Sequence, residues 1–417
     1  MTTVELPELS IAERDRRWQI ARRFMTDHDL SAILVTAADG PFRMQPYFAN
    51  TSTGTILFPA DSDPVWLGWL YDAGRVFENE RRSIEPWIAD TRIGFDALAE
   101  AAQIARERGL EGTRVGVLGI SSSGIPMGGV LPYTTGKHMF DVFEGFELID
   151  ISSQWGSAII ARSPEELQFV RHAAKACEDA TAALIEVARE GVPESELYAA
   201  VINTFAKAGA HATEPQVLLT VEPATMDFLA GPHWFFPRRQ RRLLQRGDVI
   251  QVEMFCWFGG LDSQGQVTIV VGEPEPEQAE LNEVARRAYE AGVAQVRPGA
   301  RFTDVWEAMR QVILDAGCWS ASPLVHTLSP VLNVGELHSG MMDADIDARL
   351  KTPAFVPGDF DQDWILEEGV TLAIEPCPAR GYRKALVGGA VLVTADGAEE
   401  LNDLPTHVHT VAAGVPA

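Results

Sequence analysis

The segment Val370-Thr-Leu-Ala-Ile-Glu-Pro376 decides the fold of this chain, together with the later segment Gly389-Ala-Val-Leu-Val-Thr-Ala-Asp-Gly397. Each segment holds a short apolar run bounded by polar, glycine or proline residues, which is the pattern of a buried strand. We therefore predict strands at 370–374 and 389–394, and the first of them leads directly into the carboxylate of Glu375.

Two more strands are predicted closer to the N-terminus, at 248–258 and 266–271. Alternation along the first of these strands places four side chains on one face, those of Gln251, Glu253, Phe255 and Trp257. A glutamate in the middle of such a strand is costly to bury unless it has polar partners. Glu253 is therefore a candidate site residue.

Helices with clear start and stop signals surround these strands. Ser163-Pro164-Glu165-Glu166 opens one helix with a serine N-cap, a proline in the first turn and a capping-box glutamate. Two further helices run from Ser195 to Gly209 and from Thr303 to Gly317, each after a proline-containing turn. This faint internal repeat suits a domain built from two related halves around a central site.

The first part of the chain alternates helices and strands, which predicts an α/β domain. The predicted helices cover 11–29 and 95–108, and the predicted strands cover 32–35, 55–59, 64–68 and 114–119. A boundary is expected near 155–163. The 417 residues would then form two domains, 1–157 and 158–417, each long enough for its own core.

Composition excludes several classes of protein. The formal net charge of -25 argues against a nucleic-acid partner, because phosphates would be repelled. The 4 cysteines form no CxxC pair, so neither a disulfide framework nor a zinc knuckle is predicted. The N-terminus lacks the apolar run of a signal peptide, and no stretch has the apolar length of a membrane span. We expect a cytoplasmic protein with no membrane partner.

Several segments, taken in order, resemble the pita-bread family of methionine aminopeptidase, Xaa-Pro peptidases and creatinase. They are Arg162–Glu166, Gly231-Pro232-His233 ahead of Arg246–Val249, Thr268–Gly272, Ala373-Ile-Glu-Pro376 and Val391–Gly397. The resemblance implies an α/β (α+β) fold class. A small N-terminal creatinase-like domain would precede a C-terminal pita-bread catalytic domain.

The family's pattern of metal ligands is Asp, Asp, His, Glu, Glu. The matching positions here are Glu253, Gln264, His326, Glu375 and Gly388. An amide and a residue without a side chain thus replace the two carboxylates that bridge the family's metal ions. Divalent cations in such sites need several anionic oxygens. We predict no metal pair and no cofactor, and a single weakly bound ion on the remaining ligands is the alternative.

Within the family, creatinase provides the precedent for hydrolysis without metal. His233 matches its proton-transfer histidine, and Glu375 matches one of the carboxylates that hold its cationic substrate. The second carboxylate corresponds to Gln266, so the guanidinium clamp is incomplete and creatine is not the expected substrate. We predict a metal-independent hydrolase that cleaves an amide or amidine C–N bond of a small molecule. His233, Glu253 and Glu375 would be catalytic.

Substrate-binding roles are predicted for the polar side chains of Gln264, Gln266 and His326, with His338 as a further candidate. The family motif His-Gly-x-Gly-x-x-x-His reads His326-Thr-Leu-Ser-Pro-Val-Leu-Asn333 here. The sequence therefore leaves open whether His326 or His338 faces the site. Trp234 and Trp257 are candidates for an apolar pocket wall, although core packing explains them equally well.

The resemblance also implies a homodimer in which the small domain of one subunit reaches the partner's site. Phe42, Arg43 and Tyr47 would be the candidate residues. Three other functions remain open from the sequence. They are a metal-dependent Xaa-Pro dipeptidase or aminopeptidase, a non-catalytic protein that binds a peptide or other ligand, and a lyase acting on a small zwitterion.

Overall fold

A computed structural model describes the chain in seven ranges, 6–36, 44–81, 85–120, 131–226, 242–328, 333–357 and 361–414. The chain divides into two compact units, of which the smaller is Pro7–Glu165, and the larger combines Leu6 with the chain from Glu166 onward. Helix α7 (Pro164–Val187) therefore belongs to the larger unit, except for its first two residues. The units are described separately below.

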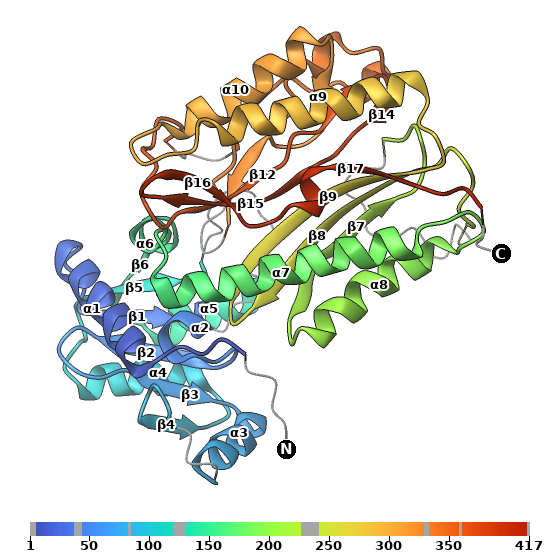
Figure 1. Ribbon diagram of the computed structural model, residues 1–417. Helices are drawn as coiled ribbons and strands as arrows, with labels where there is room; N and C mark the ends of the chain where they lie inside the picture. The colour runs from blue at the N-terminus through green and yellow to red at the C-terminus, as the bar shows by residue number, and fades with distance from the viewer. Residues whose placement is uncertain are drawn as a thin grey trace. The chain divides into compact units, whose positions relative to one another are not determined.

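The smaller unit is built on a 6-stranded sheet with the order β4-β3-β2-β1-β5-β6 (Figure 1). The strands are β1 (Ala32–Val35), β2 (Thr55–Pro59), β3 (Val65–Gly68), β4 (Asp90–Ile93), β5 (Arg114–Leu118) and β6 (Glu147–Asp150). The sheet is mixed, because β1 pairs antiparallel with β2 and parallel with β5.

Two hydrophobic clusters accompany this sheet. One contains Trp18, Phe48 and Trp155 from helices α1 (Ile11–Asp27), α2 (Gln45–Ala49) and α6 (Ser152–Ala158). The other contains Leu98 and Met139 from helices α4 (Ala97–Glu107) and α5 (Tyr133–Val142). Helix α3 (Leu70–Arg81) follows β3. Successive strand residues such as Ile33 and Leu34 belong to different clusters, as expected for a sheet with two buried faces.

Tyr47 does not have the exposed position that a residue reaching a partner subunit requires. Its exposed fraction is 7%, and its ring packs edge-on against Trp155 with centroids 5.5 Å apart. The guanidinium of Arg17 lies over the Tyr47 ring, 4.8 Å from its centroid. Tyr47 is thus a core residue of the smaller unit. Phe42 and Arg43 lie outside the described residues.

The larger unit is built on an 8-stranded sheet whose main path is β11-β12-β15-β9-β8-β7, with β16 on β15 and β17 on β9. The strands are β7 (His211–Thr220), β8 (Val249–Phe258), β9 (Leu261–Val271), β11 (Val325–Thr327), β12 (Thr371–Ile374), β15 (Gly388–Thr394), β16 (Gly397–Glu400) and β17 (Val408–Val411). Gln266 on β9 lies opposite Glu253 on β8 and opposite Gly388 on β15. Pairing therefore brings three of the predicted site positions into one row.

Helices cover both faces of this sheet, as Figure 1 shows. Helices α9 (Pro276–Val293) and α10 (Phe302–Asp315) lie on one side, and α7 and α8 (Glu194–Lys207) lie on the other. A separate 3-stranded sheet is formed by β10 (Trp319–Ser320), β13 (Pro378–Arg380) and β14 (Arg383–Lys384). Short 3₁₀ turns are η2 (Met341–Asp343), η3 (Ala348–Leu350) and η4 (Leu404–Thr406).

Helix α7 is attached to the sheet by an apolar stripe and by one buried amide. Phe169, Ala173 and Cys177 repeat at helical spacing and are buried. Asn402, with 6% exposure, donates from Nδ2 to the carbonyl oxygen of Ala174 at 2.7 Å. Its Oδ1 accepts from the backbone N–H of Ala390 on β15 at 3.0 Å. One side chain thus connects helix and strand.

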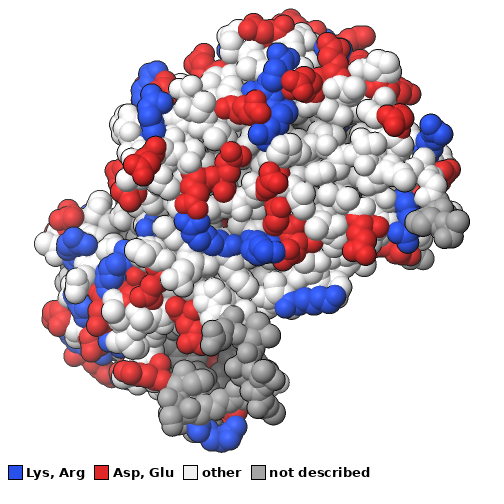
Figure 2. All heavy atoms as spheres, viewed as in Figure 1, with Lys and Arg blue, Asp and Glu red and all other residues white. Residues whose placement is uncertain are grey.

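The mixed α/β class predicted from the sequence is confirmed. The predicted strands and helices are present with shifts at their ends, and the largest shift is at β9, which begins at Leu261 rather than 266. Among the described helices, none has both the length and the apolar character needed to cross a bilayer. Figure 2 shows acidic side chains scattered over the visible face, with lysines and arginines between them.

Candidate functional site

The β8–β9 hairpin supplies the floor of the candidate site. Glu253 on β8 is 7% exposed, and Gln264 and Gln266 on β9 are 4% and 0% exposed. The two glutamines are separated by one residue, so the strand alternation points both to the same face. The register places Glu253 directly opposite Gln266. All three polar side chains are therefore buried on one face of the hairpin.

His326 and Glu375 reach the same place from the other end of the sheet. His326 lies on β11, which pairs antiparallel with β12, and Glu375 follows the last residue of β12. The backbone N–H of Glu375 donates to the carbonyl oxygen of Leu324 at 2.9 Å, which fixes the turn after the strand. The histidine is 5% exposed and the glutamate 2% exposed.

The side-chain amide of Gln266 is the centre of the group. Its Nε2 lies 2.5 Å from Glu375 Oε2, 3.2 Å from Gln264 Oε1 and 3.4 Å from Glu253 Oε1. An amide nitrogen carries two hydrogens, so it donates to these oxygens in turn or shares its hydrogens among them. We call the residues Glu253, Gln264, Gln266, His326 and Glu375 the carboxyl–amide cluster.

His326 is oriented by a backbone hydrogen bond. Its Nδ1 donates to the carbonyl oxygen of Thr327 at 2.8 Å, which leaves Nε2 to face the cluster. Nε2 lies 3.1 Å from Gln264 Oε1 and 3.4 Å from Glu375 Oε1. Burial lowers the pKa of His326 to about 4, against the opposing effect of the Thr327 carbonyl. The imidazole is therefore neutral near pH 7, with an accepting Nε2.

The two glutamates share a hydrogen bond and titrate above the usual range of carboxyl groups. Burial raises the pKa of Glu253 to about 7, while hydrogen bonds from Gln266 and Glu375 act in the opposite direction. Burial, the charge of Glu253 and the hydrogen bond to Glu253 hold the pKa of Glu375 well above its ordinary value. Within the pair, Glu375 is the hydrogen-bond donor and Glu253 is the acceptor.

Gly388 has no room for a side chain. A Cβ atom there would lie 2.5 Å from the carbonyl oxygen of Ile374, 2.7 Å from Gln266 Oε1 and 2.8 Å from the Cα of Glu375. Two of these atoms belong to the backbone, so they cannot move aside cheaply. Gln266 Oε1 is buried and has no hydrogen-bond partner among the described residues. The Gln266 amide therefore fills the space next to Gly388, but its oxygen accepts no hydrogen bond there from the described residues.

The structure brings together some of the residues predicted from the sequence and separates others. Glu253, Gln264, Gln266, His326 and Glu375 converge in the carboxyl–amide cluster. His338 instead lines a separate pocket. Trp257 is 4% exposed and lies four positions further along β8, opposite Asp262, on the order of 13 Å from Glu253 at the usual rise of a strand. His233 and Trp234 lie outside the described residues.

Lys384, a buried charged residue near the cluster, was not among the residues predicted from the sequence. It is 4% exposed, and its carbonyl oxygen accepts from Gln251 Nε2 at 2.7 Å. The signal was available, because Lys384 stands directly before the apolar run Ala385-Leu386-Val387. Within the described ranges, no group of three or more His, Cys, Asp or Glu side chains has the arrangement of a metal site.

Known proteins resemble this chain over part or most of its length. The model of metallopeptidase family M24 matches residues 168–395. A protein named creatinase from Bacillus sp. (strain B-0618) is 22% identical over 419 residues, covering 96% of this chain and 92% of that protein. A protein named Xaa-Pro dipeptidase from Pyrococcus furiosus is 24% identical over 247 residues, which is 58% of this chain and 63% of the relative.

Solved structures extend the comparison to the fold. The prolidase from Thermococcus sibiricus superposes with a TM-score of 0.72 at 17% identity, covering 97% of this chain and 100% of that one. This likeness carries the fold alone, and it includes the smaller unit as well as the larger one. Because the family model matches more than half of the chain, this protein belongs to metallopeptidase family M24, the family of the creatinases and Xaa-Pro peptidases.

Proposed function

We propose that this protein is a hydrolase that cleaves an amide or amidine C–N bond of a small molecule without a metal ion. Its relatives carry the names creatinase, Xaa-Pro dipeptidase and dipeptidase, all of them hydrolases of C–N bonds. The similarity to the protein named creatinase, over 96% of this chain, favours a small-molecule substrate.

The observation that carries the proposal is the position of the Gln266 amide. Its Nε2 donates to oxygens of Glu253, Gln264 and Glu375, which are the oxygens that a divalent cation would need. Gly388 cannot supply a further carboxylate, because even a Cβ atom would collide with the backbone of Ile374 and Glu375. The donor set does not fit a pair of dications, which in such sites are held by several anionic oxygens.

Hydrolysis in this site would need one proton acceptor and one proton donor. A water oxygen bonds to the carbonyl or amidine carbon, the C–N bond breaks, and the leaving nitrogen takes up a proton. Glu375, whose pKa is held well above its ordinary value, is the proton donor in this scheme, and Glu253 accepts the hydrogen bond of its carboxyl group. His326 Nε2 holds the other side of Glu375 at 3.4 Å.

His233 keeps the role predicted for it, which is to take the proton from the attacking water. An imidazole with an ordinary pKa is half protonated near pH 6.5, which suits a base at neutral pH. Gln264 would bind polar substrate atoms through its Nε2, since its Oε1 faces His326 and Gln266. In this scheme Gln266 positions the two glutamates, rather than binding substrate as the sequence suggested.

A metal-dependent Xaa-Pro dipeptidase is the second candidate. It is favoured by the description of the family as metallopeptidases and by the relatives with that name. Glu253, His326 and Glu375 are the ligands that would hold a single ion, and the ion would have to displace the Gln266 amide. It would polarise the scissile carbonyl.

The Gln266→Glu variant distinguishes the two candidates. The wild-type protein, dialysed against a chelator and then exposed to Mn²⁺, Co²⁺ or Zn²⁺, should retain well under about one ion per chain by elemental analysis. The variant adds a carboxylate next to Glu253, Glu375 and His326, so its affinity for these ions should rise in calorimetric titrations. Gln278→Glu, at a position that is 1% exposed but outside the cluster, is the matched control.

Hydrolysis itself is measured on Xaa-Pro dipeptides, N-acyl amino acids and amidino acids. We expect any turnover by the wild-type protein to survive chelation unchanged. Stoichiometric metal in the wild-type protein, together with activity that is lost in chelator and restored by a divalent ion, would sink the metal-free proposal and establish the dipeptidase.

A further inference from the structure

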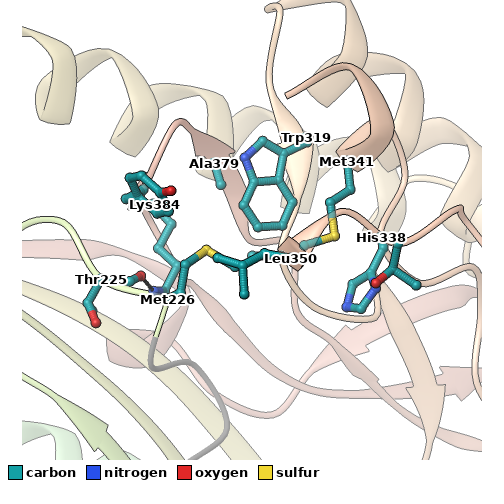
Figure 3. A pocket seen from close by; sticks show the side chains of 11 residues that line it. Thr225, Met226, Trp319, His338, Met341, Leu350, Ala379 and Lys384 are labelled. Atoms are coloured by element: carbon teal, nitrogen blue, oxygen red, sulfur yellow. Dashed lines mark hydrogen bonds between the residues drawn. The ribbon is translucent and has the colours of Figure 1, made fainter. Parts of the chain in front are cut away.

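A second site, separate from the carboxyl–amide cluster, is a pocket of about 220 Å³ against the small β10–β13–β14 sheet (Figure 3). Its wall is mainly apolar, with Met226, Trp319, Met341 and Leu350 among the lining side chains. Figure 3 shows these four side chains between Lys384 at one end and His338 at the other. The pocket therefore has an apolar middle and two nitrogen-bearing ends.

Lys384 gives the first end a buried positive charge. Its side chain belongs to β14 and is among the lining residues, although the residue is only 4% exposed. Nζ donates to the carbonyl oxygen of Thr225 at 2.5 Å, as the dashed line in Figure 3 marks. An ammonium group in such surroundings is poorly solvated, so an anionic group of a ligand would interact with it more strongly than in water.

His338 gives the second end a buried hydrogen-bonding atom. Its Nδ1 is buried and has no hydrogen-bond partner among the described residues. The backbone at His338 has φ 59, a left-handed conformation that costs a residue with a side chain free energy. The ring is also in edge contact with Phe355, with centroids 5.8 Å apart. The imidazole is thus held in place with one nitrogen unsatisfied.

The pocket is connected to the carboxyl–amide cluster by short links. Gln251, two residues before Glu253 on β8, donates to the carbonyl oxygen of Lys384 at 2.7 Å. The backbone N–H of Ala321, which lines the pocket, donates to the carbonyl oxygen of Cys377, two residues after Glu375. The pocket wall is thus hydrogen-bonded to the two segments that carry the glutamates.

We propose that this pocket binds a small organic carboxylate, with its anionic group at Lys384, its apolar body against Trp319 and Met226, and a polar group at His338. The further assignment of this carboxylate as the substrate rests on the proposed function. Within that function, it narrows the substrate class to amides or amidines of apolar, carboxylate-bearing molecules.

Three aromatic probes of one size but different charge test the charge preference. Binding of phenylacetate, phenylacetamide and phenethylamine to the wild-type protein is measured by calorimetry or ligand-observed NMR. Phenylacetate should bind about tenfold to a hundredfold more tightly than phenylacetamide, as expected for a hydrogen bond to a charged group. Phenethylamine should bind most weakly. Equal affinities for the three probes would overturn the proposal.

Variants locate the binding. Lys384→Met should abolish the preference for phenylacetate, whereas Lys351→Met, which removes a lysine outside the pocket lining, should leave it intact. Leu350→Trp, a change at a residue that is 39% exposed, should fill the pocket and weaken all three probes. Unchanged binding in Leu350→Trp would overturn the location, even if Lys384→Met fails to fold.

A second pair of probes tests His338. The hydroxyl of 4-hydroxyphenylacetate should add affinity over phenylacetate in the wild-type protein, and this gain should vanish in His338→Asn. Asparagine tolerates the left-handed backbone, so the variant should keep the fold. These measurements need no turnover, so their failure leaves the metal and hydrolysis tests unaffected. Competition between phenylacetate and a hydrolysed substrate supports the substrate assignment, and its absence refutes that assignment alone.

Discussion

At the scale of single residues, the candidate site depends on Gly388, whose lack of a side chain leaves room for the Gln266 amide. Gln266 places its amide against the Cα of Gly388, and it directs its nitrogen towards two glutamates. Glu253 and Glu375 share a hydrogen bond, which lets two buried carboxyl groups coexist with one negative charge between them. The geometry of the cluster therefore depends on a hydrogen bond between two carboxyl groups and on an uncharged amide.

Gly388→Ala should destabilise the protein. The new Cβ would meet the carbonyl oxygen of Ile374 at 2.5 Å, and relief requires a shift of the strand backbone. We expect a loss of about 1–3 kcal/mol in the free energy of unfolding, the usual cost of overpacking. Denaturant unfolding measures it. Gly265→Ala in β9 is the control, because its Cβ would make ordinary contacts at 3.4 Å. Equal losses in the two variants would contradict the packing argument.

The raised pKa of Glu253 predicts how stability depends on pH. Because the pKa of Glu253 is about 7 in the folded protein, against an ordinary value of 4.5, the folded protein binds the proton more tightly than the unfolded chain does. The contribution to stability is present below pH 4.5 and is lost as pH rises through 7. Relative to Glu253→Gln, which cannot ionise, the wild-type protein should lose on the order of 3 kcal/mol between these limits.

Unfolding of both proteins in denaturant at pH 5 and pH 8 measures this difference. Substitution by glutamine keeps the size of the side chain, so packing changes little. Glu283→Gln, at a side chain that is 70% exposed on α9, serves as the control and should leave the pH dependence unchanged. A wild-type protein that tracks Glu253→Gln at both pH values would refute the assignment of a buried, proton-binding Glu253.

At the scale of secondary-structure elements, the strands of the larger unit were predicted well where the sequence is apolar throughout. Strands β12 and β15 fit this description, and β8 shows the alternation that exposed Glu253 as unusual. The first half of β9 was missed because Asp262, Ser263 and Gln264 are polar, yet all are buried by pairing with β8. Tertiary pairing overrides local preference there.

The candidate site was predicted in part for a similar reason. The positions of Glu253, His326 and Glu375 followed from the family pattern, and the structure brings these side chains together. The central place of Gln266 was accessible from alternation, since it shares a face with Gln264. The lack of space at Gly388 was not accessible, because it arises from the backbone of Ile374 and Glu375 in three dimensions.

The link between α7 and β15 gives a prediction at this scale. Asn402→Ala removes one acceptor for Ala390 N–H and one donor for the Ala174 carbonyl, both buried. Leaving both backbone groups unsatisfied should cost about 2–5 kcal/mol in the free energy of unfolding. Asn282→Ala on α9, where the side chain is half-buried, is the control and should cost under about 1 kcal/mol. Similar losses in both variants would show that α7 is held mainly by its apolar stripe.

At the scale of the whole molecule, the chain has two compact units, and the family's fold extends over both. The homodimer, the lack of a nucleic-acid partner and the cytoplasmic location remain predictions. The formal net charge of -25 supports the second of these, because it would repel phosphates over long distances at low salt.

The close approach of Gly388 to Gln266 restricts how these two positions can change in evolution. A single codon change that introduced an acidic side chain at 388 would meet an occupied space, so its carrier would be unstable before it gained any new chemistry. A change at 266 alone would leave the opposite strand without a carboxylate. In a lineage with this pair, carboxylates at both 266 and 388 could arise only through several coordinated replacements.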